Sequence, residues 1–506
     1  MTWKMLVVSC LLTFSLFSYI ATSEGDASAL NPGVSTASKI TINPDKTISI
    51  NGKKTFPIYA YEATSTFAGV KNDGIAEIAQ RYDFTLRGWG TYWCGNPDWR
   101  TYQGQYEAAK LPYAVQAMVC SPCPSSTNTC WPVSNQKIMP FTASDRDAPQ
   151  FFGYVHIDEP LKQRYAHYDN LTATYNGLKK FDPDHPVIVN HNPYDNTATN
   201  DYILRSQDYA DIIGEDHYTI RNTYPTREDY LYYFESISSL RTFAGGKSVD
   251  NYTKPFWAVV QANGRDATDS HGSVILKTTP QEVRLETFNA ITIGYNGIGH
   301  WVYNGFAPEG NSGTWVDPVL WQGVKDLYNE IKGLNDILVL PDVARSWYQH
   351  ENDVAVLITH PNMNKTISEY GTFRKLNYVL KRDAAKNTWY LIVVNKDKTS
   401  LSNVAIKVSG VTGNMTAKTL GTLGTGSAAP GRSIHGNNGA FTDSFDGYAV
   451  HIYEISSGSA GAFKYNTTLQ EMLNQTKAKQ VQEKRLSWLE EKMNLILQWM
   501  RSIIGI

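Results

Sequence analysis

The chain has 506 residues, which exceeds one ordinary domain and suits a large barrel followed by something smaller. Hydrophobic residues make up 42% and charged residues 19%, so the composition is that of a globular protein with a large core. The 46 basic and 48 acidic residues give a net charge of −2, which argues against nucleic acid or an anionic membrane as the main partner.

The N-terminal segment predicts export from the cell. Lys4 precedes an apolar run, and Ala21 and Ser23 supply the small residues that signal peptidase prefers. We therefore predict a signal peptide over residues 1–23, a flexible segment over 24–39, and a secreted or extracellular surface location. An uncleaved membrane anchor is the alternative, and no later run is long and uncharged enough to span a bilayer.

The cysteines and the glycosylation sequons agree with export. An even number of cysteines follows the leader, which predicts two disulfides with three connectivities open, among Cys94, Cys120, Cys123 and Cys130. Zinc is the alternative because Cys120 and Cys123 form a CxxC pair, but a second pair is missing, so we expect neither metal nor cofactor. Sequons mark exposed surface if the host glycosylates, and they begin at Asn170, Asn251, Asn364, Asn414, Asn466 and Asn474.

From residue 40 onwards, strand-like and helix-like patterns alternate. After a hairpin, β-formers predict strands at residues 56–62, 84–92, 112–120, 151–159, 186–193, 211–220, 255–264 and 297–306. Helical spacing occurs at residues 74–83, 166–186, 201–210, 227–243, 279–294 and 321–334. In the fifth of these, Thr279 is the expected N-cap, with Glu282 three residues on and Gly294 as the stop. This alternation predicts an α/β fold, a (β/α)8 TIM barrel over residues 40–340.

After residue 340 the pattern changes to short strands separated by turns. This predicts a β-sandwich domain over residues 341–456, followed by a linker over 457–468. A C-terminal amphipathic helix is expected over 469–506, with an a/d stripe of Leu486, Leu489, Met493, Ile496, Met500 and Ile503. Homo-oligomerisation through this helix, docking on the sandwich, and contact with a membrane surface are the three interpretations.

Polar and aromatic residues follow the predicted barrel strands, where the functional side chains of such barrels lie. Their convergence on one rim is typical of a carbohydrate site, although the 12% of aromatic residues also suits a rich core. The candidate substrate-binding residues are Glu62, Arg87, Trp89, Asn190, His191, Tyr218, Gln261, Trp301 and Tyr303.

The fourth strand ends in Asp158, Glu159 and Pro160, and two carboxylates at a strand end are costly to bury unless they are paired or used. With eight strands and a trailing β-sandwich, residues 40–455 resemble the retaining glycoside hydrolase superfamily of (β/α)8 barrels. That resemblance implies Glu159 as the general acid, from an acid triplet at the end of strand 4, and an aromatic floor for the sugar at Trp301 and Tyr303. It also implies a Glu nucleophile after strand 7, where this chain has Gln261.

The second carboxylate that glycoside cleavage requires is expected to be Asp216, with Glu62 in reserve. Strand alternation predicts that Asp158 points away from the site. Because Asp216 follows strand 6 and not strand 7, an inverting reaction with water between the carboxyls is one hypothesis. Structural roles are the alternatives: Glu159 as a salt-bridge partner of Arg87, and Asp216 as a hydrogen-bond acceptor.

Two functions therefore remain open from the sequence. The first is a secreted glycoside hydrolase that acts on a polysaccharide or glycan. The second is a catalytically inactive barrel, a structural or carbohydrate-binding cell-surface glycoprotein, which Gln261 and the sequons favour.

Overall fold

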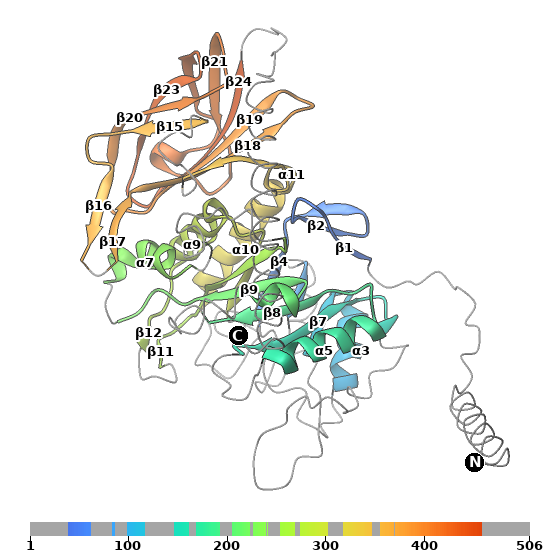
Figure 1. The fold of residues 1–506 in the computed structure, drawn as a ribbon. Coiled ribbons are helices and arrows are strands. Elements are labelled where there is room, and N and C mark those ends of the chain that lie inside the picture. The colour runs from blue at the N-terminus through green and yellow to red at the C-terminus, as the bar shows by residue number, and fades with distance from the viewer. Residues whose placement is uncertain are drawn as a thin grey trace, which may run out of the picture. The chain divides into compact units, whose positions relative to one another are not determined.

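The computed structural model describes residues 39–61, 83–86, 99–116, 146–160, 168–192, 205–222, 226–238, 240, 253–268, 274–301, 317–346, 355–368 and 370–457 (Figure 1). The chain divides into two compact units, Met1–Pro341 with Thr366–Phe373, and Asp342–Lys365 with Arg374–Ile506. The signal peptide, the helix at 74–83, the four cysteines, nearly all of the predicted linker and the C-terminal helix lie outside the described residues.

Eight parallel strands form a closed barrel in the first unit. In chain order they are β4 (Ile58–Tyr61), β5 (Phe84–Leu86), β6 (Tyr113–Gln116), β7 (Phe151–Asp158), β8 (Val187–His191), β9 (Ile212–His217), β10 (Phe256–Gln261) and β13 (Gly297–Trp301). Each strand pairs with its neighbour in this order, and β13 pairs back to β4. Each falls within a predicted strand, so the predicted α/β class is confirmed at the level of a closed parallel sheet.

Helices connect some of these strands within the described residues. They are α3 (Trp99–Ala109), α5 (Tyr168–Phe181), η1 (Ser206–Asp208), η2 (Arg227–Asp229), α7 (Tyr230–Ile237), α9 (Pro280–Ile293), α10 (Pro318–Gly333) and α11 (Asn335–Leu338). The described residues thus do not show a helix after every strand. Helix α3 was not predicted. Only residues 205–210 of the helix expected over 201–210 are described, and they contain the 3-10 turn η1. None of the described helices is long and apolar enough to cross a bilayer.

Helix α9 begins where the sequence predicted it. The Thr279 side chain accepts a hydrogen bond from the Glu282 backbone N–H, and the Glu282 carboxylate accepts one from the Thr279 backbone N–H at 2.8 Å. This reciprocal cap satisfies two of the backbone donors that a helix start leaves unpaired. Gly294 ends the helix with a φ of 125°, a conformation that favours glycine.

The barrel interior is filled by large rings opposite glycines. Tyr59 and Trp257 lie in one buried apolar cluster, with ring centroids 5.3 Å apart. On β13, a Cβ at Gly299 would lie 2.3 Å from the Tyr59 ring, and one at Gly297 would lie 2.7 Å from the Trp257 ring. The two glycines therefore make room for the two rings, as close packing of a core requires.

A small antiparallel sheet closes the amino end of the barrel. It consists of β1 (Ile40–Ile42), β2 (Ile48–Ile50) and β3 (Lys53–Thr55), and Ile40 and Ile48 belong to the same cluster as the interior rings. Because β3 runs directly into the start of β4, this sheet covers the end opposite to the one where the strands finish. The strand ends at the other rim are left for function.

The second unit contains a nine-stranded antiparallel sheet. In spatial order the strands are β14 (Asp342–Arg345), β18 (Leu376–Asp383), β19 (Thr388–Asn395), β24 (Val450–Ser457), β21 (Asn414–Thr419), β22 (Ser433–Asn437), β23 (Ala440–Phe445), β20 (Leu401–Val408) and β15 (Val356–Thr359). Strands from both halves contribute to one apolar cluster, with Leu380 and Leu391 from one half and Ile406 and Phe441 from the other. The halves thus share one core, and hydrogen bonding joins them into one continuous sheet.

Two short hairpins complete the described strands. Strands β11 (Ala267–Thr268) and β12 (Val274–Ile275) pair after β10, and β16 (Asn364–Ile367) pairs with β17 (Gly371–Arg374). The residues between Thr366 and Phe373 group with the first unit, where Phe373 packs on Tyr232 of α7 with ring centroids 5.8 Å apart.

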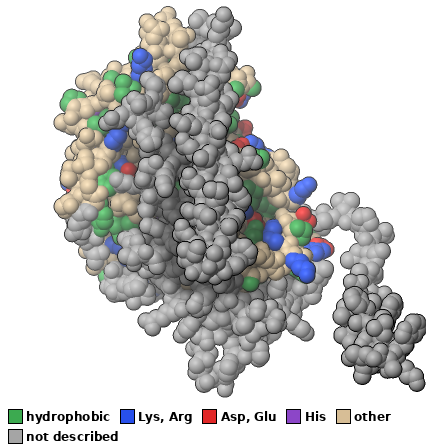
Figure 2. All heavy atoms as spheres, in the orientation of Figure 1, with side chains coloured by type: hydrophobic (Ala, Val, Ile, Leu, Met, Phe, Trp, Pro, Cys, Tyr) green, Lys and Arg blue, Asp and Glu red, His purple; other side chains and the backbone are tan. Residues whose placement is uncertain are grey.

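On the face shown in Figure 2, the described acidic and basic side chains are interspersed.

We expect the change Gly299→Ala to destabilise the first unit, because the new methyl group would overlap the Tyr59 ring. Overpacking of this kind costs about 1–3 kcal/mol. The measurement is the midpoint of urea unfolding. The control is Gly104→Ala in α3, where nothing lies within 4 Å of the new Cβ, and a helical Gly→Ala change stabilises by up to about 1 kcal/mol. Equal midpoints for both variants would contradict the packing described here.

Candidate active site at the carboxyl end of the barrel

The end of β7 departs from regular strand geometry. Val155 pairs with Ile188 and Asp158 with Asn190, so three steps along β7 match two along β8, and β7 carries a bulge. Side chains therefore do not alternate regularly between the two faces of β7 across this bulge. The prediction that Asp158 points away from the site assumed such alternation and is no longer supported by it. The Asp158 side chain itself lies outside the described atoms.

Glu159 leaves the strand with a φ of 45°, a conformation that non-glycine residues rarely adopt. Its backbone N–H donates to the Asn190 carbonyl at 2.8 Å, and its half-buried carboxylate accepts a hydrogen bond from Asn192 Nδ2 at 2.8 Å. One backbone and one side-chain hydrogen bond hold Glu159 in this conformation. Such positions occur often at functional sites.

Asp216 is the second carboxylate that the barrel brings to this rim. It is only 2% exposed, and its Oδ1 accepts a hydrogen bond from Asn190 Nδ2 at 2.8 Å. The Asn190 amide has room because the neighbouring residue on β9 is Gly214, where a Cβ would lie 2.7 Å from Asn190 Oδ1. Asn190, which the sequence suggested as a substrate-binding residue, thus contacts one of the two acids.

The two carboxylates are held by the same strand from opposite sides. Asn192, directly after β8, contacts Glu159, directly after β7, and Asn190 of β8 contacts Asp216 of β9. Adjacent strands lie about 4.8 Å apart, so the β7 and β9 backbones are separated by roughly 10 Å. The sequence singled out Asn190 but not Asn192, although both belong to the same polar run after the strand.

Two aromatic rings lie side by side at the same end of the barrel. The ring centroids of Tyr218, which follows β9, and Trp301, which ends β13, are 4.6 Å apart with an interplanar angle of 34°. Both rings are partly exposed and pack on the interior cluster beneath them. Partly exposed rings on an apolar base offer flat faces, and contact of these two residues with a substrate stays a prediction.

Gln261 is completely buried and engaged in hydrogen bonds to the backbone. Its Nε2 lies 3.1 Å from the Ile220 carbonyl, 2.7 Å from the Leu276 carbonyl and 2.9 Å from Asn263 Oδ1, while its Oε1 accepts from the Ile220 N–H at 3.0 Å. The side chain thus ties the segment after β9 to the segment after β12. This geometry corrects the expectation that Gln261 contacts substrate.

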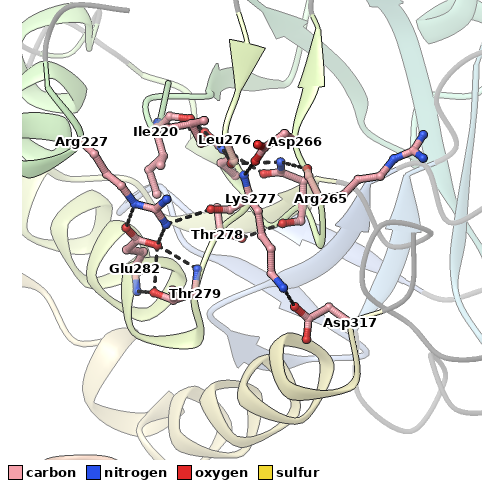
Figure 3. Close-up of polar contacts among 12 residues, drawn as sticks. Ile220, Arg227, Arg265, Asp266, Leu276, Lys277, Thr278, Thr279, Glu282 and Asp317 are labelled. Carbon is pink, nitrogen blue, oxygen red and sulfur yellow. Dashed lines mark hydrogen bonds and ion pairs between the residues drawn. The ribbon is translucent and has the colours of Figure 1, made fainter. Parts of the chain in front are cut away.

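Ion pairs and a further hydrogen bond also hold the segments after β9 and β12 (Figure 3). Arg227 pairs with Glu282 at 2.6 Å, and the Lys277 backbone N–H donates to Asp266 at 2.6 Å. Lys277 also pairs with Asp317 at the start of α10. The described segments around the rim are therefore held by side chains and not by backbone pairing alone.

Glu286 of α9 is a buried carboxyl that the sequence analysis missed. It is 0% exposed and makes hydrogen bonds with Thr219 Oγ1 and with the Gln261 backbone N–H. Burial raises the pKa of Glu286 well above its ordinary value, although these hydrogen bonds oppose the shift. No local pattern could have identified it, because α9 is buried along most of its length and a single acid there has no periodic signal.

His191 lies on the outer side of the barrel and not at the rim. It alternates with Val189 on β8, and Val189 packs in a cluster with Leu171 of α5 and Tyr209. The centroids of the His191 and Tyr209 rings are 6.4 Å apart, and His191 is 1% exposed. The strand end was predicted correctly, but the face was not, so His191 is not brought together with Glu159 and Asp216.

The remaining predicted residues have the following positions. Glu62, Arg87, Trp89, Tyr303 and the sequons at Asn251, Asn466 and Asn474 lie outside the described residues, and Asn170 is in α5 with its side chain outside them. Asn364 and Asn414 are exposed, as glycosylation requires. Within the described residues, no group of three or more His, Cys, Asp or Glu side chains is placed to hold a metal ion.

No family model and no curated protein matches this chain. Among solved structures, a glycoside hydrolase is similar at 14% identity, with 84% of this chain and 98% of that chain covered and a TM-score of 0.46. A glycoside hydrolase family 5 protein from Bacteroides vulgatus is similar at 13% identity, with 84% and 95% covered and a TM-score of 0.45. A family 51 α-L-arabinofuranosidase from Bifidobacterium longum is similar at 9% identity, with 83% and 97% covered and a TM-score of 0.44. At these values, the function proposed below rests on the geometry of the site itself.

Replacing Gln261 by Glu is expected to destabilise the protein, because a carboxylate cannot donate to the carbonyls of Ile220 and Leu276. A buried carboxylate oxygen that faces two carbonyl oxygens lowers the free energy of unfolding by about 3 kcal/mol or more. The measurement is the urea unfolding midpoint, with the exposed Gln281→Glu at the start of α9 as the matched control. A gain of hydrolytic activity in Gln261→Glu, at unchanged stability, would instead show that this position faces substrate.

Acidification is expected to destabilise the wild-type protein partly through His191. Burial lowers the pKa of His191 to about 4, so the folded state stays neutral while the unfolded chain takes up a proton below about pH 6.5. Stability therefore falls as the pH drops from 6.5 to 4, by about 1.4 kcal/mol per unit from this group.

His191→Leu removes that dependence. Its stability relative to wild type should rise by roughly 3 kcal/mol between pH 7.5 and pH 4. Urea unfolding at both pH values measures the difference, and the pH 7.5 experiment is the reference because the wild-type ring is neutral there in both states. A difference between the two proteins that does not change with pH would refute the burial of a neutral His191.

Proposed function

We propose that the carboxyl end of the barrel is the active site of a secreted glycoside hydrolase, with Glu159 as the general acid and Asp216 as the second carboxylate. One observation carries the proposal: two acids from strands on either side of β8 are each oriented by a different asparagine of the segment that ends β8. Both acids accept hydrogen bonds from neutral amides, which orient a carboxylate and leave its charge in place.

The different environments of the two acids match the two roles. The Asn192 amide donates to Oε1 of Glu159 and orients this carboxyl, which in the proposed reaction carries the proton that the leaving group needs. Asp216 accepts an amide hydrogen bond deep in the barrel, and that bond stabilises its ionised form. Glu159 then donates a proton to the glycosidic oxygen, and Asp216 accepts a proton from the attacking water.

We propose an inverting reaction. Carboxyls of inverting glycosidases lie about 6.5–9.5 Å apart and those of retaining ones about 5–5.5 Å, because only the former must admit a water molecule. The proposal of the wider separation is supported by the two different amides, Asn192 and Asn190, that hold the two carboxylates. An inverting mechanism also needs no nucleophile on β10, which agrees with the engagement of Gln261 in backbone hydrogen bonds.

The aromatic pair supplies the expected sugar contact. The partly exposed rings of Tyr218 and Trp301 lie at the same end of the barrel as the acids. An apolar face with a few convergent polar groups is the usual composition of a small-molecule site. A polysaccharide or glycan is therefore the proposed substrate class.

The second candidate is a carbohydrate-binding or structural glycoprotein without catalysis. The observation that favours it is the 2% exposure of Asp216, which leaves little of that carboxylate for a water molecule. The exposed sequons at Asn364 and Asn414 suit a glycoprotein under either proposal. Export itself is tested by expression of the full chain in a secreting host and N-terminal sequencing of the released protein.

Glu159→Gln is the decisive variant, because glutamine keeps the acceptor for Asn192 but carries no transferable proton. We expect reducing-end release from a polysaccharide panel to fall by about 10²–10⁴-fold, with an unchanged thermal midpoint. Asp216→Asn should lose activity similarly, and the exposed Asp208→Asn on η1 is the control.

The wild-type result separates the two candidates. Release of product with inverted anomeric configuration, followed by proton NMR, would support the proposed mechanism. Oligosaccharide binding by folded wild-type protein without hydrolysis would support the binding protein instead. Activity that survives in both Glu159→Gln and Asp216→Asn would place the chemistry elsewhere.

A further inference from the structure

The second unit contains a serine, a histidine and an aspartate in a hydrogen-bonded series. Ser427 lies in the 3-10 turn η6 (Gly426–Ala428), and its Oγ is 3.2 Å from Nε2 of His451 on β24. On the other side of the ring, His451 Nδ1 is 3.2 Å from Oδ2 of Asp443 on β23. This is the order and reach of a nucleophile, a base and a residue that orients the base.

The surrounding hydrogen bonds determine the tautomer of His451. The Tyr453 hydroxyl donates its single proton to Asp443 Oδ2 at 2.8 Å, and its oxygen lies 2.8 Å from His451 Nδ1. Because both groups that face Nδ1 are acceptors toward the ring, Nδ1 must carry the proton. Nε2 is then an acceptor, so the Ser427 hydroxyl is the donor in their contact.

A second set of contacts orients the serine. The Asp446 backbone N–H donates to Ser427 Oγ at 2.9 Å, and the Ser427 backbone N–H donates to Asp446 Oδ2 at 2.9 Å. The preceding Gly426 has a φ of 56°, and a Cβ there would lie 2.5 Å from Asp446 Oδ2. The turn therefore requires glycine directly before the serine. It leaves Ser427 partly exposed above an imidazole that is 1% exposed.

We propose that Ser427, His451 and Asp443 form a second reactive site, in which Ser427 is a nucleophile toward short-chain acyl esters. Ser427 Oγ bonds to the ester carbonyl carbon while its proton passes to His451 Nε2, and the alcohol leaves with that proton. Water then attacks the acyl-serine and gives one proton to His451 Nε2. His451 passes that proton to Ser427 Oγ as the carboxylic acid leaves, which restores the serine hydroxyl and the neutral imidazole. The site is independent of the barrel and of the function proposed for it.

Arg432 limits how strong this site can be. Its Nη2 lies 2.6 Å from each carboxylate oxygen of Asp443, so part of the negative charge that would stabilise a charged imidazole is already paired. We therefore expect a slow reaction, detected most clearly with strongly activated acyl or phosphonyl donors. A purely structural role, in which the network holds η6 against the sheet, predicts no reaction with them.

His451 is in the protonation state that a general base needs near neutral pH. Burial lowers its pKa below the ordinary value, while Asp443 and Asp446 act to raise it and Arg432 to lower it. The neutral imidazole can accept a proton, and it loses this ability only on acidification. Reactivity at Ser427 should thus rise with pH to a plateau, with its midpoint below about pH 6.5.

The test uses a fluorophosphonate probe on the full-length protein, since its reaction forms an O–P bond at an activated serine and releases fluoride. We expect stoichiometric labelling that mass spectrometry places on Ser427, and a labelling rate at least about 10²-fold lower in Ser427→Ala and His451→Asn. Ser402→Ala, which removes an exposed serine on β20, is the control and should label as wild type does.

Two further measurements separate reactivity from folding. Thermal unfolding shows whether His451→Asn remains folded, and the pH profile of wild-type labelling tests the base without any substitution. Release of p-nitrophenol from p-nitrophenyl acetate should be lost in Ser427→Ala but retained in Glu159→Gln, which keeps this result separate from the barrel. No labelling of folded wild type, or labelling that is equal in folded Ser427→Ala, would overturn the proposal.

Discussion

Closure of the parallel sheet is the constraint on which the candidate site depends. Pairing of β13 with β4 brings all eight strand ends to one rim, and the small sheet of β1, β2 and β3 covers the other end. Closure is compatible with a filled interior because Gly297 and Gly299 leave space for the Trp257 and Tyr59 rings. Residues from β7, β8, β9 and β13 can then meet at one rim although they are far apart in sequence.

Within that rim, amide side chains donate hydrogen bonds to both carboxylates. Asn190 and Asn192 each hold one carboxylate at 2.8 Å, and Gln261 ties two rim segments together through their backbones. Amides orient a carboxylate without neutralising it.

The second unit shows the contrasting arrangement. Asp443 is paired with Arg432 and also accepts hydrogen bonds from the Tyr453 hydroxyl and the His451 ring. Burial raises the pKa of this carboxyl, but the hydrogen bonds outweigh burial and the pKa is lowered. A carboxylate that is shared in this way orients the imidazole of His451. Because Arg432 pairs with the same carboxylate, the imidazole is also a weaker base.

The sequence alone determined the order of the barrel strands and the start of α9, because strand and helix periodicities and caps such as Thr279–Glu282 are local properties. It also indicated Glu159, Asp216, Tyr218 and Trp301, since the residues after a barrel strand can be read directly. Only the tertiary structure decided which face His191 takes, that Gln261 is engaged by backbone groups, and that Ser427 lies beside His451. The physical reason is that these outcomes depend on packing and hydrogen bonds between segments distant in sequence, and on a bulge in β7 that breaks the alternation on which residue-by-residue prediction relies.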